Sequence, residues 1–225
     1  SHHPLASLLL GVVVFIGAAC LSAAELKGQR VFSAGHSFHM FMPKMLAELA
    51  ASAGIKDHQQ AGVSSIGGSY VFQHWNVADD KNTLKTALRG GQVDVLTLSP
   101  IWLPDDAIEQ FVKLGIEHNP ALRITVQEYW MPNDEYEPVY PLQTKKKVDH
   151  NATDLAKLRD ATQRYAKDIE DYVKGINQRL GKDAVLIVPV GMAAVTLREK
   201  IVKGEAPGLK QQGELFRDNW GHAQL

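Results

Sequence analysis

Short apolar runs alternate with helical patterns from Gly28 onward. Runs rich in β-branched residues, such as VDVLTLS at 93–99, are typical of strands buried on both faces. Apolar residues spaced three or four apart predict helices, most clearly over 152–180. Strands are expected at 29–34, within 55–66, and at 93–99, 122–130 and 184–191, and helices at 38–53, 80–89, 105–118, 152–180 and 192–203.

This alternation predicts an α/β fold, a three-layer α/β/α sandwich around a mostly parallel, flavodoxin-like sheet. Crossovers between parallel strands are right-handed, so helices are expected on both faces of the sheet. A chain of 225 residues, 45% of them hydrophobic, has enough apolar side chains for one core. We therefore expect one domain over 25–225, with ligands bound beyond the carboxyl ends of the strands.

The first 24 residues have a different pattern. Residues 5–24 are apolar except for Ser7 and Ser22, and charged residues begin at Glu25. An apolar segment that ends in small residues, here the Ser-Ala-Ala at 22–24, is typical of a secretory signal with its cleavage site. It predicts an exported protein, periplasmic or extracellular, with no stable membrane association after cleavage.

Two alternatives remain for this segment. About 20 apolar residues can span a bilayer, which would make it a membrane anchor, and lipidation of Cys20 would make the protein a lipoprotein. Cys20 is the only cysteine, so a chain that begins near Glu25 has no thiol for a disulfide, for catalysis or for metal binding. The chain starts with Ser1 rather than Met, and His222 lies close to Leu225, so a fragment at both ends is expected.

The charge balance gives no reason to expect a nucleic-acid partner. The formal net charge is −1, and no long basic run is present. Phosphate-binding loops of the GxxxxGK or GxGxxG type are absent as well. We expect a small-molecule partner and no cofactor.

Polar residues that follow predicted strands mark a candidate site. The first strand runs into a Gly-His-Ser turn at 35–37, and a helical pattern begins at Phe38. A serine held there has its hydroxyl at the edge of the sheet and its N–H at a helix N-terminus, which presents a nucleophile and stabilises an anion. The simpler role of Ser37 is a helix cap. A Gly-Gly-Ser turn follows at 67–69, and Asp-Asn-Trp-Gly-His stands at 218–222.

These three motifs resemble the sequence blocks of the SGNH (GDSL-type) hydrolases. Gly-His-Ser-Phe resembles the family's Gly-Asp-Ser or Gly-Asn-Ser block, the Gly-Gly-Ser turn its second block, and the late motif its closing Asp-x-x-His block. Their order agrees with that family along nearly the whole chain after residue 24. The resemblance implies that Ser37 is the nucleophile and His222 the general base, with the N–H groups of Ser37 and Gly68 in the oxyanion hole.

The chain departs from the family pattern at three places. His36 stands where the first block has Asp or Asn, and residues 99–102 read Ser-Pro-Ile-Trp where the third block has an asparagine that supplies a side-chain amide. In the closing block Asp218 lies four residues before His222, and Asn219 three. Either Asp218 orients the imidazole through a longer loop, or Asn219 does so as a neutral partner.

Further residues after strands are candidates for substrate contacts: His36, Trp102, Glu128 and Trp130. The acids Glu128, Asp134 and Glu135 follow the fourth predicted strand, but loop acids are more often solvated than paired for glycosidase chemistry. A zinc site could be drawn from His36, His39 and His74 with a carboxylate such as Glu128. No HExxH or comparable spacing supports it, so no metal is predicted.

The function predicted from these residues is that of an exported serine esterase. It would cleave acyl esters of carbohydrates or small molecules through an acyl-Ser37 intermediate. One alternative is a non-catalytic, ligand-binding relative of the same fold, which the missing third-block asparagine and the open choice between Asp218 and Asn219 leave standing. The other is a metal-dependent hydrolase that uses His36 and His39.

Overall fold

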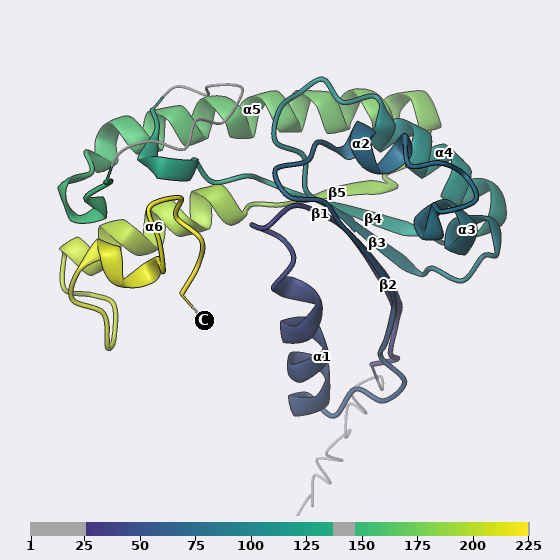
Figure 1. Ribbon diagram of the computed structural model, residues 1–225, viewed down its shortest axis with the longest axis horizontal. Coiled ribbons are helices and arrows are strands. Elements are labelled where there is room, and N and C mark those ends of the chain that lie inside the picture. Colours follow the sequence, from purple (N-terminus) through teal and green to yellow (C-terminus); the bar gives the residue numbers. More distant parts are fainter. Residues whose placement is uncertain (1–25, 137–146, 225) are drawn as a thin grey trace, which may run out of the picture.

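The computed structural model describes residues 26–136 and 147–224 (Figure 1). The segment 1–24, with Cys20, lies outside the described residues, so export stays a prediction. Among the helices of the described part, none is both long enough and apolar enough to cross a membrane.

Five strands form one parallel sheet in the order β2-β1-β3-β4-β5. This is the strand order of the flavodoxin-like doubly wound fold, and it confirms the predicted fold class. At the start of β1 the pairing with β2 shifts register by one residue, and Gly62 lies opposite Phe32. A Cβ at Gly62 would lie 2.3 Å from the Phe32 ring, so only glycine fits there. The strands are β1 (Arg30–Gly35), β2 (Gln59–Ser65), β3 (Val95–Leu98), β4 (Arg123–Gln127) and β5 (Val185–Val188).

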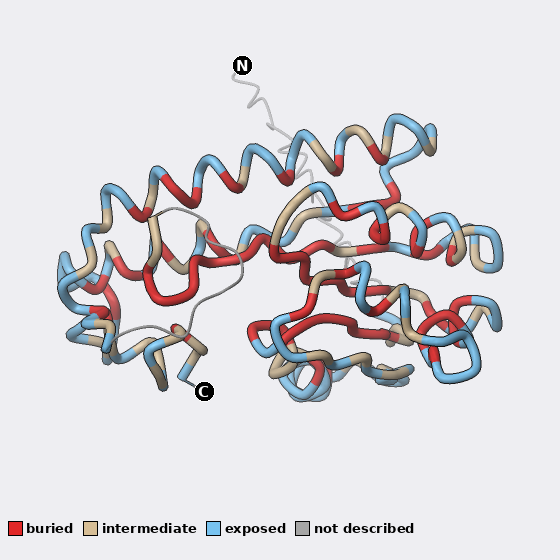
Figure 2. The backbone as a smooth tube through the Cα atoms, turned by 45° about the horizontal axis from the view of Figure 1, so that its top comes forward, coloured by how far each residue is buried: buried red, intermediate tan, exposed pale blue. Residues whose placement is uncertain are grey.

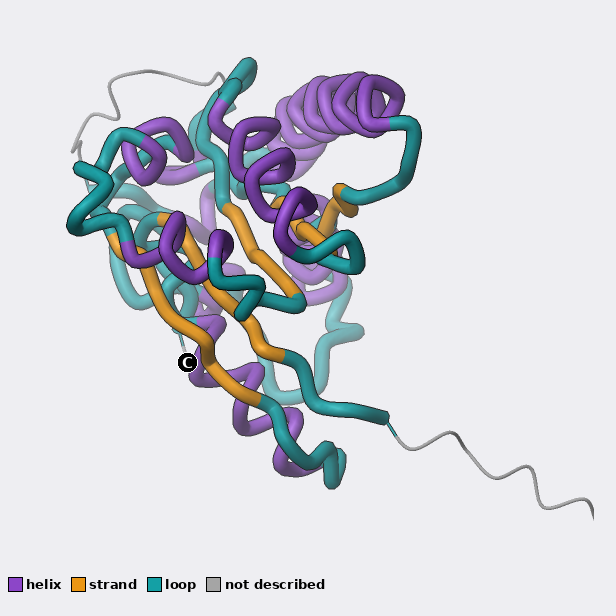
Figure 3. Tube along the Cα trace, turned by 90° about the vertical axis from the view of Figure 1, so that its right-hand side faces the viewer, coloured by secondary structure: helices purple, strands orange, loops and turns teal. Residues whose placement is uncertain are grey.

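Helices lie on both sides of this sheet (Figures 1 and 3). In Figure 1, α2 to α5 lie on one side and α1 on the other, while α6 lies beside the N-terminal half of α5. The helices are α1 (Met42–Ser52), α2 (Val71–Trp75), α3 (Thr83–Arg89), α4 (Ala107–His118), α5 (Leu155–Leu180) and α6 (Val190–Val202). Three short 3-10 helices are η1 (Pro132–Asp134), η2 (His150–Ala152) and η3 (Gln212–Leu215).

The main core lies between the sheet and the helices α3, α4 and α5. Side chains such as Phe32, Leu96 and Ile124 from the strands pack there with Phe111 and Ile169 from the helices. Figure 2 shows buried residues recurring along α5, as the spacing of its apolar positions predicts. On the opposite face, Leu186 and Val188 of β5 are exposed, so the helical cover of that face is thinner in the described part of the chain.

A second cluster of buried side chains lies past the carboxyl ends of the strands. It combines residues that follow β1, β3 and β4, several of them aromatic, with residues of α5 and α6: Phe38, Ile101, Tyr129, Trp130, Met131, Leu158, Tyr165 and Val195. The predicted strand 122–130 is shorter in the structure, because β4 ends at Gln127 and residues 129–131 enter this cluster. The cluster forms the floor beneath the candidate site.

Candidate active site

Ser37 lies in a turn that follows directly from β1. The chain leaves the strand at Gly35, turns through residues 36–41 and then enters α1. Ser37 is exposed, whereas its neighbours His36 and Phe38 are buried. Because no side chain caps α1, the capping role considered for Ser37 is absent. The turn thus exposes the Ser37 hydroxyl, while the buried side chains of His36 and Phe38 hold the turn in place.

His36 supports this turn from within. Its Nδ1 accepts a hydrogen bond from the Phe38 N–H at 3.3 Å, so its proton lies on Nε2, which donates to Ser99 Oγ at 3.0 Å. Burial, together with the neighbouring histidines, lowers the pKa of His36 to about 3 and keeps the ring neutral. The histidine thus supplies the turn with an acceptor at the position where the family block has Asp or Asn.

His39 ties the same turn to two other strands. Its Nδ1 lies 2.8 Å from Gln127 Oε1 and its Nε2 lies 2.9 Å from Thr97 Oγ1. The Gln127 amide in turn donates to the Phe38 carbonyl at 3.2 Å. His36 and His39 therefore direct all four ring nitrogens to protein groups. Among residues 26–136 and 147–224, no group of three His, Cys, Asp or Glu side chains is arranged to hold a metal ion.

The structure brings Ser37 and His222 together from opposite ends of the chain. Ser37 Oγ lies 2.7 Å from His222 Nε2, which is hydrogen-bond distance between a hydroxyl and an imidazole. The Phe38 ring packs edge-on against the imidazole, with ring centroids 4.6 Å apart, and stacks on Trp130 at 4.7 Å. The histidine is thus fixed on its apolar side by the residue next to the serine.

Asp218, rather than Asn219, contacts the imidazole. His222 Nδ1 lies 3.0 and 2.8 Å from the two carboxylate oxygens of Asp218. The backbone N–H groups of Trp220 and His222 also donate to Asp218 Oδ1. Burial alone would raise the pKa of Asp218, but the hydrogen bonds from His222 outweigh burial and lower it. Asn219 is exposed, and its side chain makes no hydrogen bond to another described residue.

Residues 216–223 form a closed hairpin that carries Asp218 and His222. Phe216 pairs with Ala223, and the Arg217 N–H donates to the His222 carbonyl at 3.0 Å. We call this segment the C-terminal hairpin. The Trp130 indole N–H, coming from the segment after β4, donates to the Gly221 carbonyl at 3.0 Å. The hairpin is therefore held against the aromatic cluster beneath Ser37.

Gly68 lies in an exposed turn after β2 and has a left-handed φ of +61°, which suits glycine. The N–H groups of Ser37 and Gly68 make no hydrogen bond to another described residue. His74 of α2 supports this turn, because its ring nitrogens lie 2.7 and 2.8 Å from the hydroxyls of Ser64 and Ser69. Burial first, and His39 second, lower the pKa of His74 to about 4, so this ring is neutral too.

The residues proposed for substrate contacts lie deeper than the sequence suggested. His36, Glu128 and Trp130 are exposed by only 2%, 1% and 7%, so these side chains have little surface left to offer a ligand. Trp102 is half-buried and packs edge-on against Tyr129. None of the four contacts the Ser37 side chain among the described hydrogen bonds and ring contacts. Direct substrate contact by these residues stays a prediction.

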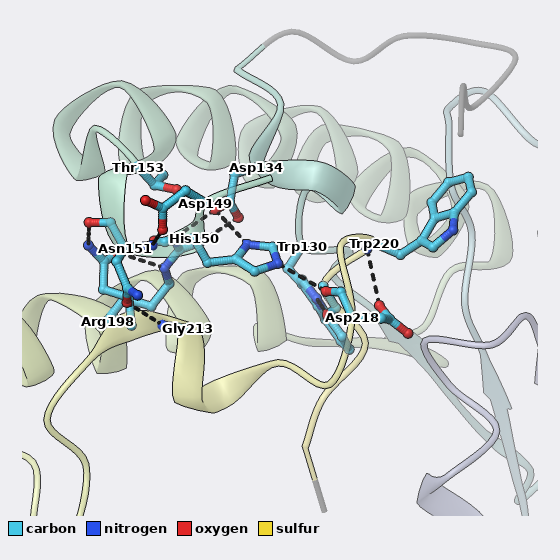
Figure 4. A network of polar contacts seen from close by, with 12 residues as sticks. Trp130, Asp134, Asp149, His150, Asn151, Thr153, Arg198, Gly213, Asp218 and Trp220 are labelled. Carbon is cyan, nitrogen blue, oxygen red and sulfur yellow. Dashed lines mark hydrogen bonds and ion pairs between the residues drawn. The ribbon is translucent and has the colours of Figure 1, made fainter. Parts of the chain in front are cut away.

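Two of the loop acids expected to be solvated are buried. Glu128 accepts a long hydrogen bond of 3.4 Å from the Met192 N–H at the start of α6, and its other oxygen has no hydrogen-bond partner among the described residues. Burial raises the pKa of Glu128 to about 7. Asp134 is exposed by only 9% and pairs with His150 and Arg198 (Figure 4). Asp134, His150 and Arg198 are far apart along the chain, so no local motif indicates that they meet.

Comparisons with known proteins add a distant similarity. No protein-family model matches the chain, and neither does any curated protein. A solved structure described as a GDSL-like lipase from Parabacteroides merdae aligns with a TM-score of 0.45 and 15% identity, over 89% of this chain and 90% of its own. Phospholipase A1 from Streptomyces albidoflavus aligns with a TM-score of 0.41 and 11% identity, over 87% and 92%.

Proposed function

We propose that this protein is a divergent SGNH-type serine esterase. The observation that carries the proposal is the chain of contacts from Ser37 Oγ to His222 Nε2 and from His222 Nδ1 to the Asp218 carboxylate. A serine hydroxyl is a weak nucleophile until a base takes its proton, and that base needs a partner which fixes its tautomer. Ser37, His222 and Asp218 have the contacts that these three roles require.

Acylation would begin when Ser37 Oγ attacks the ester carbonyl carbon and its proton passes to His222 Nε2. The negative charge on the carbonyl oxygen would be stabilised by the N–H groups of Ser37 and Gly68, which have no partner among the described residues. Asp218 stabilises the imidazolium that forms. His222 then gives its proton to the leaving alkoxide oxygen, the C–O bond breaks, and an acyl-Ser37 ester and a free alcohol result.

Deacylation reverses the roles with water. His222 takes a proton from water, the resulting hydroxide attacks the acyl carbon, and the oxyanion again accepts from the same N–H groups. Collapse of this intermediate expels Ser37 Oγ, which recovers its proton from His222, and the carboxylic acid leaves. We propose acyl esters of carbohydrates or other small molecules as substrates; the support is that Ser37 is exposed to solvent.

A fluorophosphonate probe tests this proposal without knowledge of the natural substrate. Ser37 should be the labelled residue in the intact protein, and Ser37→Ala should abolish both labelling and the cleavage of p-nitrophenyl acetate. Ser52→Ala, at an exposed serine of α1, is the matched control and should behave as the wild type. Undiminished ester cleavage by Ser37→Ala would contradict the serine mechanism, and an unlabelled, inactive wild type would favour the ligand-binding alternative.

We also propose that the protein is exported and that the mature chain begins near Glu25. The support is the apolar segment followed by small residues at 22–24. N-terminal sequencing of protein recovered outside the cytoplasm should begin near Glu25. An intact apolar segment in the membrane fraction would indicate an anchor, and acylation of Cys20 a lipoprotein.

A further inference from the structure

A second Asp–His pair lies behind the C-terminal hairpin (Figure 4). His150 of η2 lies between Asp134 of η1 and the hairpin: its Nδ1 is 2.8 Å from Asp134 Oδ2, and its Nε2 is 3.0 Å from the backbone carbonyl oxygen of Asp218. His150 thus reaches the same residue that orients His222, but from the backbone side. The proposed mechanism gives this contact no role.

Asp134 is held as a carboxylate by several donors. Arg198 of α6 donates to both of its oxygens, at 2.6 and 2.9 Å, and the Thr153 hydroxyl adds a third contact. Burial would raise the pKa of Asp134, but these bonds and the one from His150 outweigh it and lower the pKa to about 2. Arg198 itself is exposed by only 2% and is held further by Gln212 and by the His150 carbonyl.

The two partners of His150 fix its protonation. A carboxylate and a carbonyl oxygen can only accept hydrogen bonds, so both ring nitrogens of His150 must carry protons. The ring is therefore an imidazolium in the described arrangement. Burial would lower the pKa of His150, but the bonds to Asp134 and to the Asp218 carbonyl outweigh burial, and the net pKa is raised.

We infer that His150, as an imidazolium, is a positioning residue that holds the Asp218 backbone and with it the Asp218–His222 pair at Ser37. The inference rests on the proposed function, because it assigns His150 a role in the same site. Loss of one proton would leave the other on Nδ1, facing the carboxylate of Asp134. Nε2 would then turn a lone pair toward the Asp218 carbonyl, and the hairpin would lose its attachment.

The charged groups around His150 favour retention of the Nδ1 proton, so deprotonation occurs at Nε2. Asp134 comes from η1, Arg198 from α6 and Asp218 from the hairpin, while Asp149 precedes His150 in the chain and caps η2. The Asp218 carboxylate is directed to His222, so only its carbonyl meets His150. The attachment is complete below the ordinary histidine pKa of about 6.5. It is lost as the pH rises through the raised pKa of folded His150.

Nitrogen NMR of the imidazole rings tests the protonation directly in the wild-type protein. The signals of the His150 ring nitrogens are assigned as those absent from the spectrum of His150→Gln. At pH 7 both of these nitrogens should carry protons. Above the pKa of His150, the protection factors of the Gly221 and His222 amides, which correct for the intrinsic rise of exchange with pH, should fall because the hairpin is released. A neutral His150 at pH 7, or hairpin exchange that does not follow its titration, would overturn the inference whether or not the protein cleaves esters.

The rate of Ser37 labelling by a fluorophosphonate between pH 6 and 10 tests the consequence. The wild-type rate should fall about tenfold or more at high pH, the size expected for one charge-assisted hydrogen bond. His150→Gln, whose neutral amide can still donate to the Asp218 carbonyl, should remove this fall, and His150→Phe should be slow at every pH. His118→Gln, an exposed histidine at the end of α4, is the matched control and should keep the wild-type profile.

Persistence of the alkaline fall in His150→Gln, or wild-type rates in His150→Phe, would overturn the positioning role. A wild type that the probe never labels would instead contradict the proposed function. In that case the NMR measurement still decides the protonation of His150 and its coupling to the hairpin.

Discussion

The molecule contains two Asp–His pairs of almost equal geometry and different surroundings. In each, an imidazole Nδ1 lies 2.8 Å from a carboxylate oxygen. The side chains of Asp218 and His222 are 35% and 15% exposed, whereas those of Asp134 and His150 are 7% and 8% exposed. The decisive difference is the partner of Nε2: a serine hydroxyl, which donates or accepts, for His222, and a carbonyl, which only accepts, for His150.

Because their Nε2 partners differ, the two imidazoles are suited to different chemical roles. An imidazole opposite a hydroxyl can be neutral and take a proton, which is what a general base needs. An imidazole between a carboxylate and a carbonyl has no proton-accepting atom left, and it serves as a charged link. In the roles proposed here, the same two residue types supply a base in one place and a structural cation in the other.

The largest expected effect comes from removing the charge of the half-buried Asp218–His222 pair. Asp218→Asn should lower kcat for p-nitrophenyl acetate by about 10⁴-fold, because the imidazolium formed during acylation loses its counter-charge and its fixed tautomer. Asn219→Ala should change kcat little, since the exposed Asn219 side chain makes no hydrogen bond to a described residue. Intact kcat in Asp218→Asn together with a large loss in Asn219→Ala would reverse the assignment.

Breaking the buried pair should act on stability. Asp134→Asn leaves Arg198 and His150 buried without a carboxylate, and breaking a buried ion pair in this way costs about 3–5 kcal/mol. Denaturant unfolding measures this loss. Asp171→Asn, in the exposed Lys167–Asp171 pair, is the matched control and should leave the free energy of unfolding almost unchanged. Equal effects of the two substitutions would contradict the contrast drawn between buried and exposed pairs.

Glu128 extends the comparison to a buried acid without a cation. Its pKa of about 7 in the folded protein, against 4.5 ordinarily, means that the folded state retains a proton which the unfolded chain loses. Stability should therefore fall as the pH rises from about 4.5 to 7, by an amount on the order of 3 kcal/mol. Glu128→Gln should abolish this fall and be more stable than the wild type above pH 7, while Glu117→Gln should keep it. An unchanged pH profile in Glu128→Gln would contradict the burial of a charge at this site.

Chelation of metal ions should have no effect on the reaction proposed for Ser37, His222 and Asp218. Labelling of Ser37 and cleavage of p-nitrophenyl acetate should be the same with and without EDTA, because the proposed base is an imidazole and the proposed nucleophile a hydroxyl. Activity that is lost on chelation and restored by zinc would favour the metal-dependent alternative.

Much of the fold could be predicted because parallel strands buried in a sheet are short apolar runs, and the helices between them have regular apolar spacing. The five-residue helix α2 was missed, since no periodic pattern fits in so few residues. Its first N–H groups, at Val71 and Phe72, are satisfied by Asp105, which lies more than 30 residues further on. Local sequence does not show such a long-range cap.

In the candidate site, too, some residues could be predicted from local sequence and others depend on long-range contacts. Ser37, His222 and Asp218 stand in motifs whose residue types and order indicate their chemistry. The residues that support the hairpin stand in no such motif. Asp134, His150 and Arg198 meet only through tertiary packing, and each alone resembles a surface residue in the sequence. Burial of His36, Glu128 and Trp130 likewise depends on how the segments after β1 and β4 fold into the aromatic cluster.

Trapping the acyl-enzyme tests most directly the claim that Ser37, activated by His222 and Asp218, is the nucleophile. The wild-type protein is mixed with p-nitrophenyl acetate, quenched with acid during turnover, and digested for peptide mass analysis. The acetyl group should be found on Ser37, and neither the acetyl group nor turnover should be found in Ser37→Ala. Turnover by Ser37→Ala at the wild-type rate, with no acetyl group on Ser37 in the wild type, would contradict the account.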